Sequence, residues 1–275
     1  MVFEWKNNVL LITGASKGIG ASVTRQALAE GVQQVFNLDI DKENGVALQQ
    51  ELNDIYGDKK VTFIYCDVAN EEQLKTNFKL VLADKSKNYI VVNNAAIFND
   101  SLQTFKKEID INLTGLVTGS LIALDLMRKD NGGNGGTIIN MSSITAFNVV
   151  PCFPVYNATK SAILTFGISL GADEFYNRTD VRVITICCGM TDTSIILKEN
   201  IGSFDKEMVH KMIEIMEDYP NQSGDSAGRA VIEAFKYGAS ASVWLSNADN
   251  PAEDITNFVT KANKIMAEPI LKYKK

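Results

Sequence analysis

Metal-binding side chains are scarce in this 275-residue sequence, which has one histidine and four cysteines. Cys66, Cys152, Cys187 and Cys188 show no C-x-x-C spacing, which argues against a zinc site with the usual cysteine and histidine ligands. We therefore expect no metal, and we expect the thiols to be reduced and to lie in the core. His210 is interpreted as a surface residue because the sequence positions no acidic partner for it.

Long apolar runs and concentrated positive charge are also missing. No run of 18 apolar residues occurs and the first eight residues do not have the form of a secretory signal, so we expect a cytoplasmic protein without a membrane span. The formal net charge is −6 and no basic stripe is present, so we expect no nucleic-acid partner. Serine hydrolase chemistry is disfavoured because the sequence has no G-x-S-x-G motif.

Continuous apolar, β-branched runs alternate with helical stretches along the chain, without a linker between them. Such runs are typical of parallel strands that are covered on both faces, with right-handed crossovers. The sequence therefore predicts one domain over residues 1–275, with a core at about 8–245, an extension at 246–275, and a doubly wound (Rossmann) α/β parallel sheet of about seven strands. The expected strands are 9–13, 35–39, 61–66, 89–93, 137–141, 181–187 and 242–245, and the expected helices are 21–30, 42–55, 71–82, 111–129, 155–176 and 224–237.

The first expected strand ends in a glycine-rich turn that opens a helix, Thr13-Gly-Ala-Ser-Lys-Gly-Ile-Gly20. Glycines lack Cβ atoms, so backbone N–H groups there approach a pyrophosphate closely, and the helix N-terminus adds its positive dipole end. The spacing of Gly14, Gly18 and Gly20 therefore predicts a dinucleotide phosphate site. The alternative is that these glycines only pack the helix against the strand.

Asp39 ends the second expected strand, 19 residues after Gly20, where an acidic side chain accepts hydrogen bonds from the adenosine ribose. Its carboxylate would repel a 2′-phosphate, so the sequence favours NAD over NADP. Lys17 favours NADP, because its ammonium could bind the 2′-phosphate. We give Asp39 more weight, because a fixed carboxylate repels that phosphate, whereas the flexible Lys17 side chain can point elsewhere. Asp39 could instead be a helix N-cap or a turn acid, although Asp41, before Lys42, can fill that role.

A Tyr-x-x-x-Lys pair follows the fifth expected strand. Tyr156 and Lys160 are four residues apart, so on a helix they share one face, and Ser143, at the end of that strand, precedes Tyr156 by 13 residues. A second copy, Tyr56 with Lys60, follows no strand that ends in serine, and its Gly57-Asp58 suits a turn. Only the first copy predicts a catalytic group.

In this order and spacing the motifs resemble those of the short-chain dehydrogenase/reductase family, over residues 8 to 245. Residues 131–143 with Pro154-Val-Tyr156 resemble the branch that holds 15-hydroxyprostaglandin dehydrogenase and the insect alcohol dehydrogenases, which implies alcohol oxidation. Two positions depart from the family pattern, in which Asn-Asn-Ala-Gly and Pro-Gly are usual: Ala96 could crowd the adenosine side, and Cys188 in place of proline loosens the loop at the nicotinamide.

The resemblance also implies roles for individual residues. Tyr156 would take the hydroxyl proton, with its pKa lowered by Lys160 and the nicotinamide ring, and Ser143 would hold the substrate oxygen. Asn112 would keep a water that relays the proton outward. Helix caps or turns remain the alternatives for Asn112, Ser143 and Thr193. The implied NAD site comprises Gly14, Ser16, Lys17, Gly18, Ile19, Gly20, Asp39, Asp67, Val68, Asn94, Ala95, Tyr156, Lys160, Gly189, Thr191 and Thr193.

The segments around Ile97, 144–153 and 190–216 are mostly apolar, which favours a small lipophilic alcohol or ketone as substrate. Within the last of them, five apolar residues recur at helical spacing, and ordinary packing is the alternative to a substrate-covering role. They are Met208, Val209, Met212, Ile213 and Met216.

Helices 111–129 and 155–176 are apolar on more than one face, so we expect a homodimer or homotetramer that pairs them across a two-fold axis. The residues concerned are Leu113, Leu116, Leu121, Leu124 and Leu126 on the first helix, and Ile163, Leu164, Phe166, Ile168 and Leu170 on the second. A competing hypothesis, a non-catalytic homologue that binds a ligand, is suggested by Ala96 and Cys188. The intact Ser143, Tyr156 and Lys160 argue against it.

Overall fold

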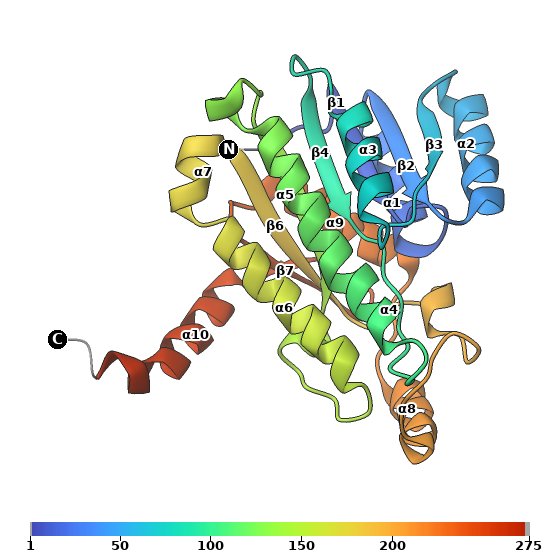
Figure 1. The fold of residues 1–275 in the computed structure, drawn as a ribbon, viewed down its shortest axis with the longest axis vertical. Helices are drawn as coiled ribbons and strands as arrows, with labels where there is room; N and C mark the ends of the chain where they lie inside the picture. The colour runs from blue at the N-terminus through green and yellow to red at the C-terminus, as the bar shows by residue number, and fades with distance from the viewer. Residues whose placement is uncertain (1, 273–275) are drawn as a thin grey trace.

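A twisted eight-stranded sheet forms the middle layer of the structure, a computed structural model that describes residues 2–272 (Figure 1). The strand order is β3-β2-β1-β4-β5-β6-β7-β8, with every pair parallel except β7 with β8. The doubly wound parallel fold is therefore confirmed. The strands are β1 (Asn8–Thr13), β2 (Gln34–Asp39), β3 (Val61–Tyr65), β4 (Asn88–Asn93), β5 (Gly136–Ser143), β6 (Val181–Cys188), β7 (Val243–Ser246) and β8 (Glu253–Asp254).

The eighth strand was not predicted, because its two acidic residues carry no apolar pattern. It pairs with the edge of β7 and leads into the last helix. Met1 and residues 273–275, the end of the predicted extension, lie outside the described residues.

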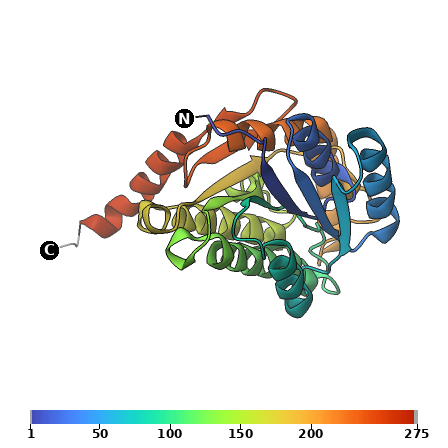
Figure 2. The ribbon, with the colours of Figure 1, turned by 90° about the horizontal axis from the view of Figure 1, so that it is seen from above.

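Helices cover both faces of the sheet, as the view in Figure 2 shows. Helices α1, α2 and α9 pack on one face, and α3, α5 and α6 on the other. The helices longer than one turn are α1 (Gly18–Ala29), α2 (Lys42–Tyr56), α3 (Glu71–Val81), α4 (Phe105–Ile109), α5 (Leu116–Met127), α6 (Pro154–Leu170), α7 (Asp173–Thr179), α8 (Lys206–Asp218), α9 (Gly224–Tyr237) and α10 (Thr256–Leu271).

Two predicted helices have different bounds in the structure. The helix expected at 111–129 begins earlier, at Phe105, and passes through a π-helical turn at Asp110–Gly115 between α4 and α5. The helix expected at 155–176 divides at Gly171 into α6 and α7. A Cβ atom at Gly171 would lie 2.5 Å from the backbone nitrogen of Ala241, so the helix ends where the chain passes close to the neighbouring loop.

The buried strands explain why one edge of the sheet collects polar groups. In β1, Leu10 and Ile12 belong to the core on the α1 and α9 side, whereas Val9 and Leu11 belong to the core on the α3 and α5 side. Strands of this kind are fixed in register by apolar contacts on both faces. Their carboxyl ends therefore meet at one edge, and the residues that follow each strand are brought together there.

Among the described residues, one continuous helical stretch, Phe105–Met127, is long and apolar enough to cross a membrane. Its most apolar window is 44% buried, and α5 packs beside α3 on β4 and β5. This is the position of a core helix, so its length and composition are weak evidence for a membrane span.

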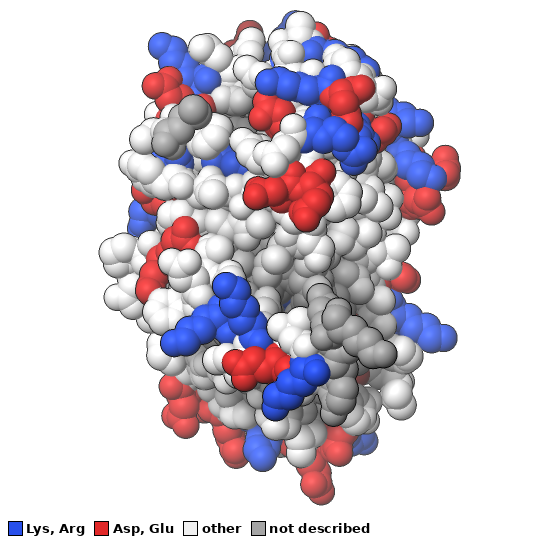
Figure 3. All heavy atoms as spheres, turned by 90° about the vertical axis from the view of Figure 1, so that its left-hand side faces the viewer, with Lys and Arg blue, Asp and Glu red and all other residues white. Residues whose placement is uncertain are grey.

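The surface agrees with the other sequence-based expectations. On the face seen in Figure 3, basic and acidic side chains are interleaved and an uncharged area crosses the middle. His210 is exposed, and the four cysteines are free and buried, as predicted. Helix α10 projects away from the sheet (Figures 1 and 2), and none of its residues is buried.

Candidate active site

The glycine-rich turn after β1 leaves no room for side chains. Gly14 and Gly18 have φ values of +66° and +55°, and a Cβ atom at Gly14 would lie 2.7 Å from the Cα atom of Ala95. Helix α1 begins at Gly18, and the residue before it, Lys17, makes no side-chain cap. The N–H groups of the first turn are thus open to an anion, as the phosphate prediction requires, and the residues present fit a dinucleotide.

Asp39 is fixed at the rim of this turn. One carboxylate oxygen accepts a hydrogen bond from the Ser16 N–H at 2.8 Å, and the other accepts from the Asp41 N–H at 2.9 Å. Asp41 caps α2 by accepting from the Asn44 N–H, so the capping alternative proposed for Asp39 is wrong. Lys17 forms an ion pair with Asp41 at 2.7 Å, which lowers the pKa of Asp41 and holds the ammonium beside a carboxylate.

The loop after β4 is tied to the glycine turn. Asn94 donates from Nδ2 to the carbonyl oxygens of Thr13 and Gly14 at 3.0 and 2.8 Å, and the Ala95 N–H donates to the Thr13 hydroxyl at 3.2 Å. The backbone at Ala96 does not have a positive φ. An alanine in place of glycine is therefore accommodated without backbone strain.

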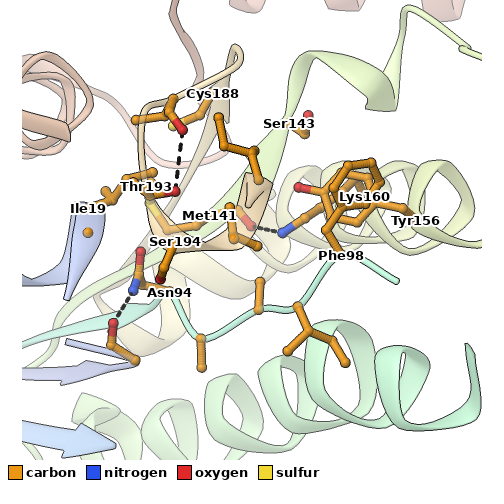
Figure 4. Close-up of a pocket in the computed structure, with 18 of the residues that line it drawn as sticks. Ile19, Asn94, Phe98, Met141, Ser143, Tyr156, Lys160, Cys188, Thr193 and Ser194 are labelled. Atoms are coloured by element: carbon orange, nitrogen blue, oxygen red, sulfur yellow. Dashed lines mark hydrogen bonds between the residues drawn. The ribbon is translucent and has the colours of Figure 1, made fainter. Parts of the chain in front are cut away.

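Tyr156, Lys160 and Ser143 meet at one cavity (Figure 4). Lys160 lies one turn after Tyr156 on α6, with its Nζ atom 5.4 Å from the tyrosine ring centroid and donating to the carbonyl oxygen of Met141 at 3.1 Å. Ser143, the last residue of β5, accepts at its hydroxyl from the Thr145 N–H, and it lies close enough to Tyr156 to lower the pKa of the phenol. The second Tyr-x-x-x-Lys copy lies elsewhere, since Tyr56 ends α2 before a glycine with φ of +106°.

Asn112 lies within the π-helical turn, fully buried. Its Oδ1 accepts from the Ile97 N–H and its Nδ2 donates to the Ile97 carbonyl, both at 2.8 Å. The amide is thus used to hold the loop after β4, and it is not among the residues that line the cavity. A π-helical turn is a frequent feature of functional sites. The relay role of Asn112 stays a prediction.

The cavity has a volume of about 550 Å³ and joins most of the predicted cofactor residues to Tyr156, Lys160 and Ser143. Three predicted site residues, Ser16, Gly20 and Asn112, lie behind its wall. The predicted residues that line it are Gly14, Lys17, Gly18, Ile19, Asp39, Asp67, Val68, Asn94, Ala95, Ser143, Tyr156, Lys160, Gly189, Thr191 and Thr193.

Burial works against the charged forms of both central groups. It raises the pKa of Tyr156, and the nearby carboxyl of Glu108 raises it further. Burial also lowers the pKa of Lys160 to about 8. The sequence predicted a lowered pKa for Tyr156. The chain's own groups act in the opposite direction, because the desolvation of the phenolate outweighs the attraction of the single Lys160 ammonium. Lowering the tyrosine pKa requires the additional positive charge of an oxidised nicotinamide ring.

The far end of the cavity is apolar. Phe98 packs against Tyr156 and Phe153, with ring centroids 4.6 and 4.9 Å away, and Ile215 and Met216 of α8 close the side. The helical stripe that the sequence indicated on α8 therefore divides between two roles. Met216, at its C-terminal end, lines the cavity, whereas Met212 is fully buried behind it in the apolar cluster that also contains Phe98 and Phe153.

Two acidic residues that the sequence analysis did not single out, Asp100 and Glu108, are fully buried beside α6. They occur in a polar stretch that has the composition of a solvated loop, so composition and spacing carry no signal for them. Only the fold brings them to the start of the helix that carries Tyr156.

Comparison with known proteins places these features in a family. The sequence profile of the family described as short chain dehydrogenase matches residues 8–202. A 15-hydroxyprostaglandin dehydrogenase [NAD(+)] from Bos taurus is 37% identical over 73% of this chain and 76% of its own length, and the Homo sapiens protein is 36% identical over 71% and 74%. Alcohol dehydrogenase 2 from Ceratitis capitata is 29% identical over 87% of this chain and 91% of its own length.

Solved structures support the fold. Levodione reductase has a TM-score of 0.74 at 21% identity, with 88% of this chain and 97% of that chain covered. A 3-ketoacyl-(acyl-carrier-protein) reductase from Brucella melitensis, complexed with NADH, has a TM-score of 0.73 at 19% identity, with 89% and 98% covered. The family profile spans most of the chain, and the resemblance seen in the sequence is confirmed. The chain belongs to the short chain dehydrogenase family and is an oxidoreductase.

Proposed function

We propose that the protein uses NAD to interconvert a secondary alcohol and a ketone on a lipophilic small molecule. The observation that carries the proposal is the single cavity in which Tyr156, Lys160 and Ser143 lie between the glycine-rich turn and an apolar wall. The relatives named as dehydrogenases act on alcohols, and two of them carry NAD(+) in their names. These names support the reaction class and the cofactor.

Each polar residue has a part in this reaction. Ser143 donates a hydrogen bond to the substrate oxygen and holds the carbinol beside Tyr156. Tyr156 accepts the hydroxyl proton as a general base, and the Lys160 ammonium stabilises the phenolate. NAD⁺, when bound, accepts the hydride and adds positive charge near the tyrosine. The apolar walls exclude water and strengthen these charge interactions.

An assay of NADH formation over a panel of secondary alcohols tests the proposal. Each additional methylene buried against the apolar wall contributes about 0.8 kcal/mol, so three of them should raise kcat/KM more than about tenfold over a short secondary alcohol. A flat response across chain length would contradict a lipophilic substrate. No turnover of any prostanoid, isoprenoid, steroid or short alcohol would instead favour the non-catalytic homologue.

The cofactor preference depends on Asp39. We expect NADH to bind more tightly than NADPH, because the fixed carboxylate meets the ribose hydroxyls. Asp39→Ala removes charge-assisted hydrogen bonds of about 1.5 kcal/mol or more and should weaken NADH binding about tenfold. Binding is measured by quenching of intrinsic fluorescence during titration.

Asp41→Ala is the matched variant for the same experiment, because it releases Lys17 without removing the acid at the ribose position. It should leave NADH affinity within a few-fold of wild type. A wild type that prefers NADPH would overturn the assignment to Asp39 and favour Lys17 as the phosphate-binding residue.

We also propose a homodimer or homotetramer. Figure 1 shows α5 and α6 side by side on the outer face, with no further helix in front of them. Leu116, Leu124, Ile163, Leu164 and Leu170 are buried within the subunit, so the apolar surface left for a partner is smaller than the sequence suggested. Leu121 is 48% exposed and is the best remaining contact.

Sedimentation at micromolar concentration should therefore show a dimer or larger species. Leu121→Lys should shift the distribution toward monomer, whereas Leu102→Lys, at an exposed position in the loop before α4, should not. A monomeric wild type would refute this assembly.

A cytoplasmic location is part of the proposal. The four cysteines are buried, and none of them forms a disulfide. Free thiols of this kind are typical of a reducing compartment.

A further inference from the structure

The helix that carries Tyr156 has no cap of its own. The residue before α6, Phe153, offers no side-chain acceptor, and Pro154 at the first position has no N–H. The next two N–H groups, of Val155 and Tyr156, donate to the two carboxylate oxygens of Asp100 at 2.7 and 3.1 Å. Asp100 is 1% exposed and comes from the loop after β4. A buried carboxylate from another segment therefore caps the catalytic helix.

The same loop is joined to the segment that leads into α8. The Asp100 N–H donates to the carbonyl oxygen of Gly202 at 2.9 Å, and the Asn99 side chain donates to the carbonyl oxygen of Asn200 at 3.0 Å. Asp100 thus connects the tyrosine helix with the chain beside the substrate end of the cavity. A shift of Asp100 would therefore move both the start of α6 and the segment that leads into α8.

Glu108 of α4 lies next to Asp100 and is 0% exposed. Its Oε1 accepts from the Asn99 N–H at 3.1 Å, and its Oε2 is buried without a hydrogen-bond partner, close enough to Asp100 for that carboxyl to raise its pKa. Burial and the charge of Asp100 raise the pKa of Glu108 to about 8. Two carboxylates cannot both be ionised cheaply in such a site, so the pair shares one negative charge at neutral pH.

The charged and titratable groups that face this pair come from two elements. Tyr156 and Lys160 lie on α6, and Cys188 lies at the end of β6 next to Lys160. The negative form of Glu108 raises the pKa of Tyr156 and that of Lys160. Glu108 is therefore electrically coupled to the base without lining the cavity.

We propose that Asp100 and Glu108 form a buried carboxyl pair that positions Tyr156 and sets the pH range of its proton transfer. The inference rests on the proposed alcohol oxidation. Asp100, ionised, holds the start of α6 in place. Glu108, protonated, keeps the pair at a single charge, and its ionisation places a second negative charge near Tyr156, which opposes formation of the phenolate.

Glu108→Gln preserves the shape of the side chain and removes this ionisation. Alcohol oxidation rises with pH as Tyr156 loses its proton. The rates of alcohol oxidation of wild type and variant should agree at about pH 6, where Glu108 is protonated. Above about pH 8 the variant should be several-fold faster, and its rate should reach its plateau about one pH unit earlier. Profiles of identical shape, scaled by one factor at every pH, would reduce Glu108 to a packing role and overturn the coupling.

Asp100→Asn tests the positioning role. The amide can accept only one of the two N–H groups and carries no charge, so kcat should fall about tenfold or more. The KM for NAD⁺ should stay within two-fold, because the glycine-rich turn is untouched. Asp173→Asn, at an exposed acid in the first turn of α7, is the control and should change neither value. Equal losses in kcat and in NAD⁺ binding would contradict a specific effect on Tyr156.

A stability measurement keeps the test independent of turnover. Because the pKa of Glu108 is raised in the folded state, the stability that its protonation provides is present at low pH and is lost as pH rises toward about 8. The melting temperature of Glu108→Gln minus that of wild type should therefore increase between about pH 5 and pH 8. A constant difference would refute the buried pair, even if no alcohol were oxidised. Failure of the proposed function would appear separately, as a wild type without turnover or a Tyr156→Phe variant with normal turnover.

Discussion

Tyr156→Phe should lower kcat for alcohol oxidation at least about a thousandfold, because the variant keeps the ring and loses the only atom that accepts the substrate proton. The ring contacts with Phe98 and Phe153 persist, so folding should be preserved. NADH binding should also persist, because the glycine-rich turn and Asp39 are unchanged. Stopped-flow measurement of hydride transfer, together with fluorescence titration of NADH, separates the two effects.

The chain provides a matched control for this experiment. Tyr56→Phe alters the second Tyr-x-x-x-Lys copy, whose tyrosine ends α2 at the surface and does not line the cavity. Its kcat should equal that of wild type. If Tyr56→Phe caused the same loss, the wrong tyrosine would have been assigned, and comparable turnover in Tyr156→Phe would refute proton transfer by this residue.

The parts of the fold that follow from local pattern were predictable. Val9 to Ile12 and the glycine-rich turn after them show an apolar strand followed by a helix start, and both form as expected. The position of Ser143 relative to Tyr156 singled out the copy of the motif that lines the cavity, because only that copy follows a strand at the carboxyl edge of the sheet. These signals are contained within about 20 residues of one another.

Other features depend on contacts between distant segments. Gly171 divides α6 from α7 because the loop at Ala241 approaches it, which no periodicity reveals. The π-helical turn places the Asn112 side chain against Ile97 instead of the cavity. Asp100 reaches α6 across 55 residues of sequence. The chain's own groups raise the pKa of Tyr156 because the depth of burial, which dominates that pKa, is a property of the folded chain that the sequence does not show.

Lys160→Met should lower kcat about a hundredfold or more and move the remaining activity to higher pH, since the phenolate loses its ammonium partner. The same substitution should raise the melting temperature. Burial lowers the pKa of Lys160 to about 8, so below that pH the folded protein holds a desolvated ammonium that donates to the Met141 carbonyl. Methionine has a similar length and no charge to bury.

The sign of the change in melting temperature in Lys160→Met distinguishes a catalytic role of Lys160 from a role in holding the fold together. A lysine whose folded pKa is depressed loses stability as pH falls from its unfolded pKa of about 10.5 to its folded pKa of about 8, so the advantage of Lys160→Met should grow from about pH 10.5 to about pH 8 and stay level below that. Lys60→Met, at the half-buried lysine that donates to the Gln33 carbonyl, is the control and should alter neither activity nor the pH dependence of melting. A lower melting temperature in Lys160→Met at every pH would show that the lysine holds the fold together. A higher melting temperature with lost turnover would show that the chain retains a destabilising buried charge because the base at Tyr156 requires it.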